Sequence, residues 1–378
     1  SSHLLRYEDV CAEPVTALLT AAAAAGLVVD ERRLAEAVDR LRGRGGLDAS
    51  TWDHALPQSD VRAVEADHAP TMRALGYPVS HDDATLAATA QALAARRRHA
   101  DTRWDRLPAH LGLDVSAGAV AESLPGARLP QSWLQIAPGT AVVSLVGGTR
   151  VAVHDGERAV VDLPPDVRAS GDSGWVTQGW AVAVAMLQRG HLLVHAAAVE
   201  IDGAAVCVAG RSGAGKSTTA VGLRARGHRL LVDDVSVLDR AGDDFVVLPY
   251  LRGVHLTPTS AAGLGIDFEN LPALSAGRGK ATFFAEDPGS GPVALTTIVV
   301  LVPSADVSEV VVDEPAGAER LRVLAPHVDR ESAAAAILGP QRHFELTAAL
   351  AGAVRVVRLR RPVGEWSLDE VLDAIERV

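Results

Sequence analysis

The segment GRSGAGKS, residues 210–217, limits the architectures open to this chain more than any other stretch, because it matches G-x-x-x-x-G-K-[ST] in full. The apolar run AAVCVAG leads into it and a helix-forming run follows, which predicts a strand, a loop and a helix in that order. Glycines allow the backbone to wrap a phosphate group with its N–H groups pointing inward, and the helix N-terminus adds partial positive charge. The segment therefore predicts a nucleotide site.

Individual roles within this phosphate-binding loop (P-loop) follow from side-chain chemistry. Lys216 is expected to bridge the outer phosphates, and Ser217 to offer its hydroxyl to Mg²⁺. The chain lacks a guanine-reading N-K-x-D motif, which favours ATP over GTP. The residues expected to contact ATP are Gly210, Arg211, Ser212, Gly213, Ala214, Gly215, Lys216, Ser217 and Thr218.

Two adjacent carboxylates, Asp233 and Asp234, follow the apolar run LLV shortly after the P-loop helix. The stretch RLLVDDVSVL, residues 229–238, is predicted to be a strand. Neighbouring residues of a strand point to opposite faces, so the two carboxylates should divide two tasks. One is expected to face the acceptor as a base, and the other to face the metal or a structural partner.

Composition excludes several classes of protein. The 378 residues carry a formal net charge of -11, which argues against broad binding to nucleic acid or anionic membranes. No run approaches the roughly 18 apolar residues of a membrane span. The two cysteines, Cys11 and Cys207, are not expected to form a disulfide, and a reducing cytoplasm fits best.

The basic residues are unevenly divided, since only two of the 36 are lysines, Lys216 and Lys280. Arginine is a broad planar fork and lysine a compact charge, so each surviving lysine indicates a position that arginine does not serve. Lys280 lies in the glycine-flanked basic stretch SAGRGKATFF, residues 275–284. We weigh a role in neutralising phosphoryl charge there against an ordinary exposed cation.

The chain divides into two predicted domains. Residues 1–130 show helical periodicity and form a predicted helical domain that recognises substrate or acts as a lid. Residues 131–378 mix short β-rich runs with helices, which predicts an α/β domain with a mixed sheet. The last helix is expected to begin at a capping box formed by Ser367 and Glu370.

Residues 192–238 resemble the catalytic core of HPr kinase/phosphorylase. They are still more similar to HPr-kinase-related proteins of peptide modification, including lasso-peptide tailoring kinases. The resemblance rests on a histidine in the strand before the loop, on the loop, and on the spacing of the aspartate pair in RGHRLLVDD. It implies an HPr-kinase/PEP-carboxykinase-like P-loop fold that uses ATP and Mg²⁺.

The resemblance also implies roles for single residues. Asp233 corresponds to the family's proton acceptor, and His195 and Lys216 to other active-site positions. Ser217 corresponds to a magnesium ligand, and Asp234 is expected to share the metal. Arg278 or Lys280 corresponds to a catalytic arginine region.

One departure concerns the metal. Tyr250 stands where the family carries a metal-binding glutamate, so metal binding is expected to rest on Asp234 or on water. The departure puts the reverse phosphorylase reaction, and HPr itself as substrate, in doubt.

Three functions remain open from the sequence. The first is an ATP-dependent kinase that phosphorylates a serine or threonine hydroxyl of a peptide or protein. The second is a kinase of a small alcohol such as a sugar or a natural product, and the third is a P-loop switch with no acceptor but water. The aspartate pair beside the loop favours the first two. A homo-oligomer is compatible with all three.

Overall fold

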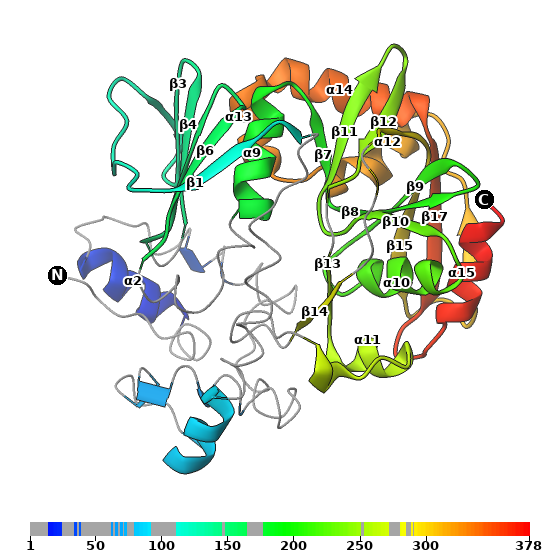
Figure 1. The fold of residues 1–378 in the computed structure, drawn as a ribbon, viewed down its shortest axis with the longest axis horizontal. Helices are drawn as coiled ribbons and strands as arrows, with labels where there is room; N and C mark the ends of the chain where they lie inside the picture. The colour runs from blue at the N-terminus through cyan, green and yellow to red at the C-terminus, as the bar shows by residue number, and fades with distance from the viewer. Residues whose placement is uncertain are drawn as a thin grey trace. The chain divides into compact units, whose positions relative to one another are not determined.

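The structure is a computed structural model. It describes residues 14–24, 79–91, 111–145, 148–164, 177–250, 253–271, 280–284, 289 and 291–378, with scattered positions between 34 and 73. The chain forms two compact units, 1–89 and 90–378 (Figure 1). In the part of the chain that is described, no helix is long and apolar enough to cross a membrane.

The first unit is helical wherever regular structure is described in it. It contains α2 (Pro14–Ala24) and the beginning of a second helix at residues 83–89. The buried carboxylate of Glu65 holds the segment that leads into this second helix. It accepts hydrogen bonds from the N–H groups of Ser80 and His81 at 2.7 and 3.1 Å. These residues agree with the helical prediction for the N-terminal region.

The second unit begins with a six-stranded sheet in the order β1-β6-β5-β4-β3-β2. All its pairs are antiparallel except β1 with β6. Its strands are β1 (Asp114–Ala117), β2 (Arg128–Gln131), β3 (Leu134–Ala137), β4 (Thr140–Ser144), β5 (Arg150–His154) and β6 (Arg158–Asp162).

This small sheet corrects the predicted extent of the helical region. Strand β1 and the start of β2 lie within residues 1–130, and the compact units divide at residue 89 rather than at 130. Strands β1 and β2 are each four residues long, and β1 pairs with β6, which follows some forty residues later. Local periodicity is too short to reveal such strands.

The rest of the second unit is built on a nine-stranded mixed sheet. Seven strands follow the order β10-β8-β9-β15-β12-β11-β7, while β17 pairs with β15, and β16 with β17. These are β7 (Leu192–Val194), β8 (Ala196–Ile201), β9 (Ala204–Gly210), β10 (Arg229–Val232), β11 (Ser236–Ala241), β12 (Asp244–Leu248), β15 (Val293–Ser304), β16 (Val311–Asp313) and β17 (Arg355–Pro362). A two-stranded sheet of β13 (Gly253–Leu256) and β14 (Ala281–Phe284) lies apart from it.

Helices cover both faces of the nine-stranded sheet, and two apolar clusters result. On one face α10 and α15 pack over Val208 and Val299. The other cluster joins α9, α13 and α14 to residues such as Cys207 and Ile298. The main helices are α9 (Val182–Gln188), α10 (Lys216–Ala225), α11 (Pro258–Gly263), α12 (Ala318–Leu324), α13 (Glu331–Leu338), α14 (Pro340–Ala353) and α15 (Leu368–Glu376), with shorter turns at η3 (Thr177–Ala181), η4 (Phe268–Asn270) and η5 (Ala325–His327). The mixed α/β prediction is confirmed.

Two local predictions were wrong. The single strand expected at 229–238 is two strands, because β10 pairs with β8 whereas β11 pairs with β7 and β12. The aspartate pair lies in the bend between them. The expected capping box is also not formed, since Ser367 is the N-cap of α15 but its side chain makes no capping hydrogen bond.

Candidate active site

The P-loop joins β9 to α10 through backbone that requires glycine. Gly210 has φ 152°, and a Cβ there would lie 2.9 Å from the Leu301 carbonyl oxygen on β15. Gly215, the N-cap of α10, has φ 109°, a backbone conformation that residues with a side chain rarely adopt. The first N–H groups of α10 have no partner within the helix, so they remain available to an anion at the loop.

Lys216 is buried, and its ammonium group faces the inside of the loop. Its Nζ donates to the carbonyl oxygens of Gly210 at 2.9 Å and Arg211 at 3.3 Å. Burial lowers the pKa of Lys216, and the charges of Asp234 and Asp233 oppose that shift. The ammonium group is thus already held where a phosphate oxygen can replace a carbonyl oxygen as its partner.

Asp233 is only 2% exposed and contacts the P-loop. The Ser217 hydroxyl lies 3.0 Å from each of its carboxylate oxygens and donates to them. Burial, and then the negative charge of Asp234, raise the pKa of Asp233 to about 6. An incoming acceptor cannot easily reach a carboxylate that is enclosed in this way.

Asp234 lies on the open side of the same bend. It has φ 70°, and its side chain is 49% exposed. Its Oδ1 lies 3.7 Å from Nδ1 of His195, and Oδ1 of Asp329 lies 3.9 Å from the same nitrogen. Both distances exceed those of hydrogen bonds. Of the two neighbouring carboxylates, Asp234 is the one that an acceptor can approach.

His195 is held beside the P-loop by a segment from much later in the chain. Its N–H donates to the carbonyl oxygen of His327 at 2.7 Å, and the N–H of Asp329 donates to Leu193 at 2.9 Å. Burial, and then the charge of Lys216, lower the pKa of His195. The imidazole is therefore expected to be neutral near pH 7, although Asp234 opposes the shift.

Sequence reasoning missed the segment that supports His195. Arg330 pairs with the carboxylate of Asp329 and places its guanidinium 4.6 Å from the ring centre of Trp180. Burial lowers the pKa of His327 to about 4. The only local signal was the polar cluster HVDRE between two helical runs, and its partners lie more than a hundred residues earlier.

The remaining sequence predictions lie at the edge of this site. The charge of Lys280 helps to lower the pKa of both His195 and Lys216, which indicates that its ammonium group lies near them. Arg278 lies outside the described residues. Tyr250 is buried, and its hydroxyl donates to the carbonyl oxygen of Val235. It therefore does not take the place of a metal ligand.

The residues present fit Mg²⁺ held jointly with a nucleotide. Ser217 and Asp233 offer hard oxygen ligands within hydrogen-bond reach of each other. No group of three or more acidic, histidine or cysteine side chains able to hold a metal occurs among the described residues. Since Mg²⁺ commonly takes one or two protein ligands together with phosphates and water, this sparse set is appropriate.

Comparison with known proteins finds a matching family model for the segment around the loop. Residues 185–248 match the family model described as HPr Serine kinase C-terminal domain. Through this segment the chain is similar to HPr kinases. The matched residues include the P-loop, His195 and both aspartates, whereas Lys280 and Asp329 lie outside the match.

Individual relatives agree over the same region. The chain is 40% identical over 90 residues to the HPr kinase/phosphorylase of Peptoclostridium acidaminophilum, covering 22% of this chain and 27% of that protein. It is 56% identical over 41 residues to that of Lactobacillus acidophilus, covering 11% and 13%. The matched part is thus about a quarter of these relatives' length or less.

Among solved structures, the Hpr(Ser) kinase/phosphatase from Coxiella burnetii aligns with 49% of this chain and 90% of its own. The TM-score of that alignment is 0.26 and the identity 15%.

Proposed function

We propose that this chain is an ATP-dependent kinase that transfers the γ-phosphoryl group to the hydroxyl of a serine or threonine in a protein or peptide. The observation that carries the proposal is an exposed carboxylate, Asp234, beside a P-loop whose lysine and serine are already in place. The match to a domain described as a serine kinase supports the same acceptor chemistry.

The nucleotide phosphates would be held by the N–H groups at the start of α10 and by Lys216. Ser217 and Asp233 would hold Mg²⁺, which neutralises the negative charge of the phosphates when it is bound. Charge neutralisation and positioning supply most of the catalysis in phosphoryl transfer. Lys280 is suited by its charge to assist at the γ-phosphate.

Asp234 would accept the proton of the attacking hydroxyl. The hydroxyl oxygen forms a bond to the γ-phosphorus, the bond between that phosphorus and its bridging oxygen breaks, and ADP leaves. This division reverses the roles expected from the sequence, which gave the base to Asp233 and a metal ligand to Asp234. The reversal follows from the burial of Asp233 against Ser217 and from the exposure of Asp234.

The proposal also extends to the acceptor, the location and the assembly of the protein. A peptide acceptor would fit the resemblance to peptide-tailoring kinases, with the N-terminal region gripping the peptide. A cytoplasmic site and a homo-oligomer remain compatible predictions. The small-molecule kinase and the switch remain as alternatives, and the accessible carboxylate argues most directly against the switch.

The test is a transfer assay with Mg²⁺–ATP and two acceptors, purified HPr and a short serine-containing peptide. Mass spectrometry reads the gain of one phosphoryl group on the acceptor, and chromatography reads the conversion of ATP to ADP. We expect phosphoserine or phosphothreonine with equal formation of ADP. Steady release of inorganic phosphate with both acceptors unmodified would favour the switch, and a phosphorylated sugar from a metabolite extract would favour the small-molecule kinase.

A further inference from the structure

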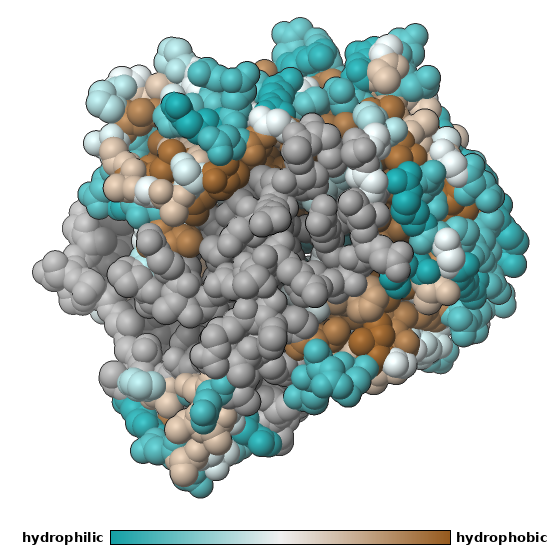
Figure 2. Space-filling view, viewed as in Figure 1, coloured by the Kyte–Doolittle hydropathy of each residue, from teal (hydrophilic) through white to brown (hydrophobic). Residues whose placement is uncertain are grey.

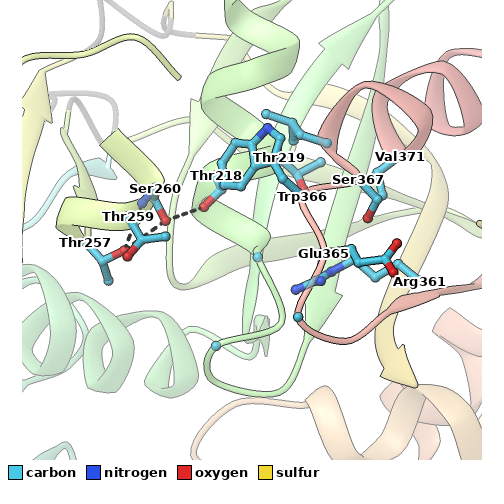
Figure 3. A pocket seen from close by; sticks show the side chains of 14 residues that line it. Thr218, Thr219, Thr257, Thr259, Ser260, Arg361, Glu365, Trp366, Ser367 and Val371 are labelled. Carbon is cyan, nitrogen blue, oxygen red and sulfur yellow. Dashed lines mark hydrogen bonds between the residues drawn. The ribbon is translucent and has the colours of Figure 1, made fainter. Parts of the chain in front are cut away.

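A pocket of about 410 Å³ adjoins the P-loop next to α10 (Figure 3). It lies between α11, the start of α10 and the segment that joins β17 to α15. Its volume is in the range of small-ligand sites. The P-loop and α10 residues that line it are Gly213, Gly215, Thr218 and Thr219, and the opposite wall includes Trp366 and Ser367.

We propose that this pocket holds the base and ribose of the nucleotide, with the base stacked on the indole of Trp366. The inference rests on the proposed function for the presence of a nucleotide, and it adds the residues that recognise the nucleoside. Its ligand is a nucleoside diphosphate or triphosphate.

The order of residues along α10 gives the direction of the nucleotide. Ser217 contacts Asp233, whereas the next residue, Thr218, lines the pocket. In the sheet, β10 leads to the aspartate pair on one side of β9, and β17 leads to Trp366 on the other side, beyond β15. A nucleotide with its outer phosphates near Asp234 therefore directs its nucleoside toward the pocket.

Trp366 is held as a platform rather than left as a loose surface side chain. A Cβ on Gly263 would overlap the indole ring, so the ring rests against α11 where that helix has no side chain. The residue is nevertheless 50% exposed. An exposed aromatic face fixed in position is suited to stack on a base, since every base offers a flat π-face. Figure 2 shows largely hydrophilic residues over the edge of the molecule where α15 lies.

Polar groups of the pocket suit a ribose or a base edge. Ser367 Oγ is buried and has no hydrogen-bond partner among the described residues, because it does not cap α15. Across the pocket, the Thr218 hydroxyl donates to Ser260 at 2.8 Å, and Thr257 donates to Ser260 at 3.0 Å. Hydroxyl groups both donate and accept, so they can bind a ribose without requiring one particular base.

Arg361 connects the segment that carries Trp366 to the P-loop. Its guanidinium donates to the carbonyl oxygen of Ala214 at 3.0 and 3.2 Å, and it lies five residues before Trp366. The P-loop and the segment that carries Trp366 are thus held together before a ligand contacts both.

The experiment compares two ligands on the full chain by calorimetry, ADP and inorganic tripolyphosphate, each with Mg²⁺. Tripolyphosphate carries the phosphates without base or ribose. For Trp366→Ala we expect ADP affinity to fall about 10- to 100-fold, with tripolyphosphate affinity changed less than about twofold. Trp366→Phe should restore most of the ADP affinity. Gly263→Ala, which pushes the indole away, should weaken ADP alone.

Phe344→Ala is the matched control, because Phe344 is an aromatic residue 61% exposed on α14, outside the pocket. It should leave both affinities unchanged. The inference is overturned if Trp366→Ala binds ADP as the wild type does, or if it weakens both ligands equally. A wild type that binds ADP through Trp366 but phosphorylates no acceptor would contradict the proposed function and leave the pocket standing. A wild type that binds neither ligand would contradict both.

Discussion

The two sheets of the second unit each bury a polar side chain, and they compensate its burial differently. In the small sheet, Gln135 accepts a hydrogen bond from Leu124 N–H and donates one to the Glu122 carbonyl oxygen, both at 2.7 Å. In the large sheet, Asp233 accepts from Ser217 and from backbone N–H groups, yet burial still raises its pKa.

The difference shows which buried group serves structure and which serves binding. Gln135 is neutral, and backbone groups of Glu122 and Leu124 satisfy the hydrogen bonds of its amide. Its burial therefore requires no bound ligand. Asp233 is a buried carboxylate whose pKa remains raised, so a bound cation would offset the cost of burying its charge. Lys216 is comparable, because its partners are loop carbonyl oxygens that a phosphate can replace.

The largest expected effect follows from removing the P-loop lysine. Lys216→Ala should reduce phosphoryl transfer by at least about 100- to 1000-fold, since a preorganised charge at the developing negative charge is lost. The matched control is Arg224→Ala on the same helix, whose guanidinium lies over Phe283 rather than at the loop. Comparable losses in both variants would show that damage to α10, and not the missing ammonium group, is responsible.

Asp233→Asn should raise the stability of the protein without ligand and weaken the effect of Mg²⁺ on nucleotide binding. A carboxyl group whose pKa is raised on folding destabilises the folded state above that pKa, so the variant without ligand should gain on the order of 1–3 kcal/mol at pH 8. It should also lose the tightening of nucleotide binding by Mg²⁺. Chemical unfolding and calorimetry with and without Mg²⁺ measure the two effects, and a destabilised variant would contradict the account.

The pH dependence follows from the same carboxyl group. The pKa of Asp233 is raised from its ordinary value to about 6, so without ligand the free energy of unfolding should decrease as pH rises from about 4 to about 6. Affinity for Mg²⁺–ADP should move oppositely and weaken by up to about tenfold for each pH unit below 6. Titrations between pH 5 and 8 test this, and Asp233→Asn should remove this dependence.

A substitution in the small sheet should have the smallest effect on nucleotide binding. Gln135→Ala should cost about 1–3 kcal/mol of stability, because it leaves the Leu124 N–H and Glu122 carbonyl groups without their partner. Affinity for ADP should be unchanged while the protein is folded. A loss of ADP affinity in a variant that remains folded would show that the two sheets are not as independent as their buried side chains indicate.

Sequence predicted the parts of the fold whose interactions are local. The P-loop and its flanking strand and helix carry their signal in adjacent residues, and the structure forms them as β9, the loop and α10. The split between β10 and β11 was missed because it depends on which strands pair with each half.

The sequence named Lys216, Ser217, His195 and the two aspartates as site candidates, but it did not give the arrangement of their side chains. Asp233 and Asp234 are equivalent in sequence, and only the fold buries one against Ser217 and exposes the other. Two residues were missed because they come from segments more than a hundred residues later in the chain: Asp329, which lies beside His195, and Trp366, which lines the pocket next to the P-loop. No local pattern distinguishes them from ordinary surface residues.

The most direct test of the account measures transfer and binding together in Asp234→Asn, with Asp233→Asn beside it. For Asp234→Asn we predict phosphoryl transfer reduced at least about 100-fold, with Mg²⁺–ADP affinity within about threefold of wild type. The opposite result would contradict the account: transfer near the wild-type rate in Asp234→Asn, with transfer lost but Mg²⁺–ADP binding normal in Asp233→Asn.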